Sequence, residues 1–186
     1  MTVDEIKRKI RQRMEKSRES LKDELKKIRS GRASASLVEG VIVEYYDNRL
    51  PLKQLATISV PEPRLIVVQP WDKGALSSIE KAFHKSDLML NPNNDGKVIR
   101  INIPPLTEER RKELVKVAKG KAEDARVAVR NIRRDGNEET KAAEKDGHLS
   151  EDLSKKTQDE IQKITDEFIK HINELLDAKE KEIMEV

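Results

Sequence analysis

The sequence predicts an α+β fold, in which an elongated antiparallel three-helix bundle carries a small inserted β/α/β domain. The first observation is that residues 1–30 and 106–186 repeat apolar side chains at helical spacing over many turns, whereas residues 31–105 change period and composition. The second is composition: 39% of the 186 residues are charged and only 3% are aromatic. Long amphipathic helices with an aliphatic core fit that mixture. We therefore expect two domains, residues 1–30 with 106–186 and residues 31–105.

The first predicted helix is about 25 residues long and ends where Ser30 and Gly31 supply stop signals. Its apolar strip advances in steps of three and four and comprises Ile6, Ile10, Met14, Ser17, Leu21, Leu25 and Ile28. One strip of side chains cannot bury itself. This helix therefore needs partner helices.

The second predicted helix begins after Pro104 and Pro105, where Thr107 can cap its first N–H groups. Its apolar strip comprises Leu114, Ala118, Ala122, Ala125, Val129 and Ile132. Gly136 costs a helix about 1 kcal/mol relative to alanine. The helix either weakens there or continues to about Lys145, and we favour continuation.

The third predicted helix begins at Ser150, after a turn at Gly147. Its apolar strip comprises Leu153, Thr157, Ile161, Ile164, Phe168, Ile172, Leu175 and Ile183. Three amphipathic helices of this length predict a three-helix bundle with the strips as its core.

Residues 31–105 have strand composition and turn signals. We expect strands at 41–46, around Leu50, and at 55–60, 65–69 and 98–103, with a helix at 73–85. We expect Trp71 to pack in the core at a strand-to-helix corner, with contact to a partner as the alternative. Residues 91–96 resemble a calcium loop, but Asn102 stands where a bidentate Glu is required, so we expect a hairpin turn.

The two crossings between the predicted domains, residues 29–32 and 103–106, are short. Glycine in one and prolines in the other suit localised bending. We therefore predict a hinge at Ser30, Gly31, Pro104 and Pro105, with a rigid junction as the alternative.

Cations line up along the second predicted helix, about a third of a turn from its apolar strip. The row comprises Lys112, Lys119, Arg126, Arg130 and Arg133, with Lys116 and Arg134 at its edge. It extends over roughly 30 Å at about 1.5 Å per residue, which spans several phosphates of a nucleic acid backbone. A solvated face is the simpler interpretation. Residues 107–134 hold ten cations and five anions, whereas residues 150–186 hold six and eleven, so the bundle has basic and acidic sides.

The sequence lacks the residues that several classes of function require. There is no cysteine, and neither a G-x-x-x-x-G-K-[ST] nor a G-x-G-x-x-G motif occurs. No histidine lies at zinc-ligand spacing from a second ligand. We expect no enzyme, no cofactor and no metal. No apolar run approaches about 18 residues and no signal core opens the chain, so we expect a cytoplasmic, monomeric protein without membrane contact.

Five stretches, in order and over nearly the entire chain, resemble the bacterial ribosome recycling factor family. They are IRSGRASASLVEGVIVEYY, QLATISV, SDLMLNPNNDGKVIRINIPPLTEERRKEL, ARVAVRNIRRD and IQKITDEFIKHI. The chain departs from the family at Met89, usually glycine, at Ala35, often proline, and at Gly136.

The resemblance implies an L-shaped molecule that acts after translation termination. With elongation factor G and GTP it would split the ribosome into subunits and release messenger and deacylated transfer RNA. The bundle would lie on ribosomal RNA of the large subunit, with Arg130 and Arg133 as the principal contacts and Arg29 and Arg32 as weaker ones. The inserted domain would receive force from the GTPase, and we place that contact at Asp47, Asn48 and Arg49.

Two other classes remain open. A helical scaffold or chaperone for acidic proteins would also explain the basic row, and competition by ribosomal RNA but not by acidic protein would exclude it. An enzyme is the poorest alternative, because no nucleophile, metal set or phosphate loop is evident.

Overall fold

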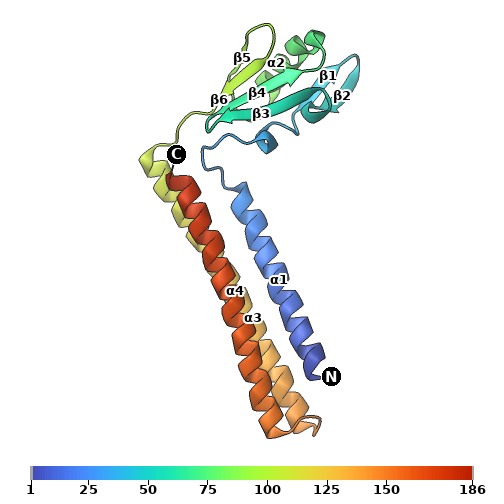
Figure 1. The fold of residues 1–186 in the computed structure, drawn as a ribbon, viewed down its shortest axis with the longest axis vertical. Helices are drawn as coiled ribbons and strands as arrows, with labels where there is room; N and C mark the ends of the chain where they lie inside the picture. Colours follow the sequence, from blue (N-terminus) through green and yellow to red (C-terminus); the bar gives the residue numbers. More distant parts are fainter. Residues whose placement is uncertain (1, 186) are drawn as a thin grey trace. The chain divides into compact units, whose positions relative to one another are not determined.

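The computed structural model describes residues 2–185 and divides them into two compact units (Figure 1). One unit contains the residues up to Arg29 together with Glu108–Glu185. The other is Ser30–Thr107. A helical bundle with an inserted sheet domain confirms the predicted α+β fold class.

The first unit is a bundle of α1 (Val3–Lys27), α3 (Glu108–Lys145) and α4 (Glu151–Met184). Figure 1 shows that α1 and α4 run in the same direction and α3 runs opposite to both. The three apolar strips meet in one continuous core around Met14, Val129 and Phe168. Each helix therefore buries the face that its sequence period selects.

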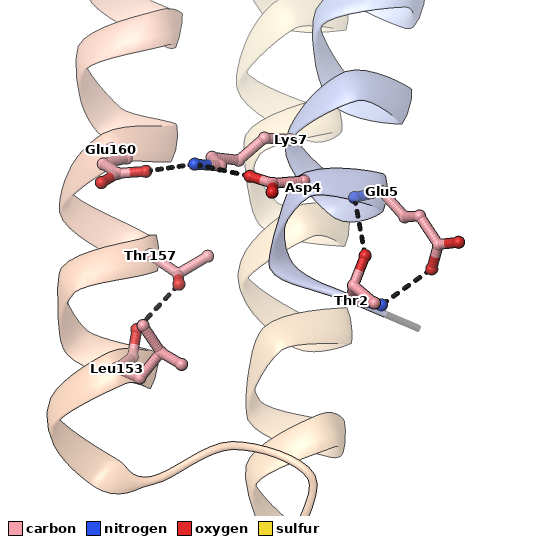
Figure 2. Close-up of polar contacts among 7 residues, drawn as sticks. All are labelled: Thr2, Asp4, Glu5, Lys7, Leu153, Thr157 and Glu160. Atoms are coloured by element: carbon pink, nitrogen blue, oxygen red, sulfur yellow. Dashed lines mark hydrogen bonds and ion pairs between the residues drawn. The ribbon is translucent and has the colours of Figure 1, made fainter.

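Leu153 is a correction to the predicted third strip. Its side chain is 41% exposed, and the neighbouring Ser154 is fully buried instead. Leu153 lies in the first turn of α4, where its carbonyl accepts a hydrogen bond from Thr157 Oγ1 at 2.7 Å (Figure 2). The remaining residues of that strip are buried or partly buried against the core.

The start of α1 is fixed by local hydrogen bonds and by one contact to α4 (Figure 2). Thr2 and Glu5 form a reciprocal capping box, in which Glu5 N–H donates to Thr2 Oγ1 at 3.3 Å and Thr2 N–H donates to Glu5 Oε2 at 2.8 Å. Lys7 Nζ lies 2.7 Å from Glu160 Oε2 and 3.2 Å from Asp4 Oδ1. The hydrogen bond to Glu160, followed by that to Asp4, raises the pKa of Lys7.

Continuation of α3 through Gly136 is confirmed, and the reason is packing. A Cβ atom at Gly136 would lie 2.2 Å from Ile10 Cδ1 and 3.0 Å from Ile10 Cγ1, so it would collide with the side chain that α1 packs against this position. Thr140 Oγ1 donates to the Gly136 carbonyl at 2.8 Å one turn later. The glycine therefore weakens helix propensity but permits close approach of the two helices.

The second unit contains a hairpin, a four-stranded antiparallel sheet and one helix. The sheet order is β3-β4-β6-β5, and β1 and β2 form a separate two-stranded hairpin. The elements are β1 (Ile42–Tyr45), β2 (Asn48–Pro51), β3 (Ala56–Glu62), β4 (Leu65–Pro70), α2 (Leu76–Lys85), β5 (Pro92–Asn94) and β6 (Ile99–Asn102), with short 3-10 turns at Ala35–Leu37, Leu52–Gln54 and Lys73–Ala75. Helix α2 buries Ile79 and Phe83 against the same core as Ile66 and Ile101.

Two predictions for this unit are wrong in part. The segment expected to be a hairpin turn begins with an edge strand, β5, whose Asn94 pairs with Ile99; the turn follows at Asp95 and Gly96. Trp71 is 69% exposed rather than in the core. Its Nε1–H donates to Thr57 Oγ1 at 3.0 Å, which satisfies the indole without burying it.

Tyr45 has an unusual hydrogen bond at the end of β1. Its hydroxyl donates to Asp72 Oδ2, while Asp72 Oδ1 accepts from Gly74 N–H at 2.9 Å. The bond to Asp72 raises the pKa of Tyr45 to about 12. The same bond, with that from Gly74, lowers the pKa of Asp72.

We expect Asp72→Asn to lower the pKa of Tyr45 from about 12 toward the ordinary value of about 10. Because the folded-state pKa is raised, this bond stabilises the fold fully below the unfolded-state pKa, and its contribution disappears as pH rises through the folded-state value. Absorbance titration of the phenolate in a Tyr46→Phe background observes Tyr45 alone. An unchanged pKa in Asp72→Asn would contradict the assignment.

Candidate nucleic-acid interface

Three arginines of the predicted row lie on the side of α3 that meets α4. Arg126 Nη1 donates to Asn173 Oδ1 at 2.7 Å, and Arg133 Nη1 donates to Gln162 Oε1 at 3.1 Å, so both arginines are fixed by α4. The side chain of Arg126 is 21% exposed and that of Arg130 is 38% exposed. The guanidinium groups are neither buried in the core nor scattered.

Glu123 connects two of these arginines. Its Oε2 accepts from Arg126 Nε at 2.9 Å, and its Oε1 accepts from Arg130 Nη2. The hydrogen bonds from Arg126 and then Arg130 lower the pKa of Glu123, so the carboxylate stays ionised at neutral pH. One carboxylate therefore orients two guanidinium groups from successive turns of α3.

Arg133 is held by a second chain of hydrogen bonds on α4. Gln162 accepts from Arg133 with Oε1, and its Nε2 donates to Asp166 Oδ1 at 2.8 Å. Asp166 thereby fixes the amide of Gln162 with its oxygen toward the guanidinium. Each of the three arginines thus has a defined partner and still exposes part of its side chain.

The other predicted cations of α3 lie at exposed positions, outside the hydrogen-bonded cluster around Glu123. Lys112 Nζ lies 2.9 Å from Glu108, and Lys119 Nζ lies 3.7 Å from Glu180, both at exposed positions. Arg134 is exposed. These side chains extend the positive surface without forming part of the Glu123 cluster.

Arg29 and Arg32 lie at the first crossing between the units and are both exposed. Arg29 closes the bundle unit, and Arg32 belongs to the sheet unit.

The predicted hinge residues have distinct surroundings within the sheet unit. Gly31 has φ +79°, and a Cβ there would lie 3.0 Å from Leu106 Cγ, whereas Ser30 is buried and Pro104 and Pro105 are exposed. Ala33 N–H donates to the Pro63 carbonyl and Ile103 N–H to the Arg64 carbonyl, both at 2.8 Å. The β3–β4 turn thus holds the chain next to both crossings within the sheet unit.

The predicted partner-contact residues form the tip of the β1–β2 hairpin. Asp47, Asn48 and Arg49 are exposed, and Asp47 has φ +59° in the tight turn. Tyr46, which precedes them, is 79% exposed. The tip therefore presents polar, charged and aromatic groups together.

Within residues 2–185, no three His, Cys, Asp or Glu side chains are grouped to hold a metal ion. No described helix combines the length and the apolar character that a membrane span requires.

Comparisons with known proteins identify the family. The sequence profile described as ribosome recycling factor matches residues 21–184. The chain belongs to the ribosome recycling factor family. The ribosome-recycling factor of Carboxydothermus hydrogenoformans is 59% identical over 184 residues, which cover 99% of this chain and 100% of that protein. The ribosome-recycling factor of Natranaerobius thermophilus is 57% identical, over 97% of this chain and 98% of that protein.

Solved structures agree with this membership. A solution structure of the ribosome recycling factor is similar with a TM-score of 0.74 and 47% identity, covering 100% of this chain and 99% of the other. A second similar chain, with a TM-score of 0.64 and 50% identity, covers 99% of this chain and 100% of the other. It comes from models of the T. thermophilus ribosome recycling factor and the E. coli elongation factor G bound to the E. coli post-termination complex. Ribosome recycling is therefore the function of this chain.

The polar residues that hold the arginines of α3 were not predicted from the sequence. Glu123 precedes Arg126 by three residues and Arg130 by seven, a helical spacing that places all three on one side of α3. That spacing could have indicated the cluster. Asn173 and Gln162 lie on another helix, and only the packing of α4 on α3 brings them into contact.

Proposed function

We propose that this chain acts with elongation factor G and GTP to split the post-termination ribosome into subunits, releasing messenger and deacylated transfer RNA. Its bundle domain, residues 1–30 and 106–186, binds large-subunit ribosomal RNA through the basic side of α3. The supporting observation is the row of Arg126, Arg130 and Arg133, each oriented by a hydrogen-bond partner and partly exposed. The similar factor seen with elongation factor G on a post-termination complex supports the choice of partners.

The chemistry of arginine suits this role. A planar guanidinium group can donate two parallel hydrogen bonds to phosphate oxygens and remains charged at physiological pH. Contacts to phosphate position a protein on RNA without reading its sequence. Arg130 and Arg133 are the principal contacts, with Arg126, Arg134, Lys112, Lys119, Arg29 and Arg32 as supporting ones.

The inserted domain, residues 31–105, receives force from the GTPase at Asp47, Asn48 and Arg49, and the hinge at residues 29–32 and 103–106 transmits it. The exposed tip of the β1–β2 hairpin supports this contact. The anchors at Pro63 and Arg64 support bending at the crossings rather than within the sheet. The chain acts as a monomer in the cytoplasm and has no catalytic centre of its own, so GTP hydrolysis belongs to the partner.

Subunit splitting measured by light scattering tests this function. Post-termination ribosomes are mixed with the chain, elongation factor G and GTP, and each component is omitted in turn. We expect the scattering to fall rapidly only when all three are present. Equal splitting without the chain, or with the chain but without the GTPase, would contradict the proposal.

Two sets of variants separate the proposed roles of the domains in the same assay. Asp47→Ala with Arg49→Ala alters the exposed tip and is expected to slow splitting while binding to large subunits is retained. Arg133→Ala is expected to weaken binding itself. Normal splitting by the tip variant would reject the contact at the hairpin.

A further inference from the structure

The acidic side chain inside the basic row requires an explanation. Glu123 accepts hydrogen bonds from both Arg126 and Arg130, is 51% exposed, and would repel any phosphate that approaches them. By charge alone, a site for RNA would be better without it. Its carboxylate nevertheless holds both guanidinium groups, with one oxygen on Arg126 Nε and the other on Arg130 Nη2.

We propose that Glu123 is a positioning residue, which orders Arg126 and Arg130 for phosphate and thereby strengthens RNA binding despite its negative charge. This inference rests on the proposed RNA-binding function of α3. An arginine side chain loses considerable rotamer freedom when it is ordered, and a site whose donors are already ordered loses less on binding. Glu123 and Asn173 together leave Arg126 little freedom, because they occupy its Nε and Nη1 from two directions.

The geometry leaves donors available for phosphate. Arg126 uses Nε and Nη1 in the protein, and Arg130 uses Nη2. A guanidinium group carries five N–H donors. The lowered pKa of Glu123 agrees with a carboxylate that remains charged while it orients its two partners.

Removing the charge of Glu123 distinguishes positioning from a simple effect of charge, because the two predict opposite changes in affinity for large ribosomal subunits. Glu123→Gln keeps the size of the side chain but loses the second carboxylate oxygen. If only charge matters, the variant binds large ribosomal subunits more tightly. If Glu123 positions the arginines, binding weakens, and we expect a loss on the order of tenfold.

Glu113→Gln is the matched control. Glu113 is on the same helix, is 57% exposed and pairs with Arg110 at 2.7 Å, but it lies outside the row. At about 100° per residue it points away from Arg126 and Arg130. We expect this variant to bind as well as the natural chain or slightly more tightly.

The measurement is equilibrium binding of the full chain to purified large subunits, with thermal melting of each variant as a check on folding. Asn173→Ala, which removes the other partner of Arg126, should also weaken binding. In an Arg126→Ala, Arg130→Ala background, Glu123→Gln should cause no further loss, because its partners are absent. If the role of Glu123 were purely structural, Glu123→Gln would instead lower the melting temperature, and it would do so in the Arg126→Ala, Arg130→Ala background as well.

Unchanged or tighter binding by Glu123→Gln would overturn the inference. The proposed function fails separately, if the Arg126→Ala, Arg130→Ala chain binds large subunits as well as the natural chain does. A weakened arginine variant together with a tighter Glu123→Gln variant would leave RNA binding in place and reject positioning alone.

Discussion

Arg133→Ala is expected to weaken binding to the large ribosomal subunit by about tenfold to a hundredfold, because a hydrogen bond to a charged group contributes about 1.5–3 kcal/mol. The side chain is partly exposed on α3 and is held at 3.1 Å by Gln162, so it is already ordered for a phosphate. Lysine at the same position is expected to restore only part of the affinity, since an ammonium group cannot form the bidentate contact. Equilibrium binding at a fixed moderate salt concentration measures both variants.

Arg110→Ala is the control for this prediction. Arg110 lies on α3, is 59% exposed and pairs with Glu113, yet it points to another side of the helix. We expect the free energy of unfolding of both alanine variants to lie within about 0.5 kcal/mol of that of the natural chain, as is usual for surface substitutions. Equal losses of affinity at Arg110 and Arg133 would indicate a general effect of charge rather than a site.

Gly136→Ala and Gly120→Ala are expected to change stability in opposite directions, although both replace a glycine within α3. At Gly120 nothing lies within 4 Å of an added Cβ, so the alanine should stabilise the bundle by about 0.5–1 kcal/mol through helix propensity. At Gly136 the Cβ would lie 2.2 Å from Ile10 Cδ1. Overpacking of that kind costs about 1–3 kcal/mol, which exceeds the gain in propensity.

Thermal or denaturant unfolding measures the pair, and a second substitution identifies the cause. Ile10→Val removes the Cδ1 atom that an alanine at position 136 would meet. The Gly136→Ala, Ile10→Val chain should therefore be more stable than the sum of its single variants predicts. Strict additivity of the two changes would show that Ile10 does not determine the cost at Gly136.

The helical part of the fold could be predicted from sequence because its apolar strips repeat over many turns. Met14, Val129 and Phe168 were all assigned to the core by period alone, and all are buried. Leu153 fails at the first turn of α4, where Ser154 takes the buried position. The period of apolar residues identifies the buried face in the middle of a helix. At the end of the helix, the packing of neighbouring helices decides which side chain is covered.

The inserted unit was less predictable because its elements are short. Pro92, Asn93 and Asn94 are typical turn residues, and only pairing with β6 makes them a strand. Trp71 was assigned to the core because it stands at a strand-to-helix corner, but its indole donates a hydrogen bond to Thr57 at the surface. In both cases contacts between distant residues override the local preference.

The candidate site, too, could be predicted from the sequence only in part. The row of arginines follows from helical period, because residues 126, 130 and 133 lie on one side of a single helix. Their partners Asn173 and Gln162 do not follow from it, since they come from α4. The roles of these residues in RNA binding remain predictions.

The salt dependence of binding to large ribosomal subunits tests most directly whether the arginine row of α3 holds ribosomal phosphate. The logarithm of the association constant is plotted against the logarithm of salt concentration for the natural chain and for Arg130→Ala with Arg133→Ala. Each lost phosphate contact should lower the slope by about one, so the double variant should bind more weakly with a slope smaller by about two. An unchanged slope, even with weaker binding, would contradict phosphate contact by these arginines.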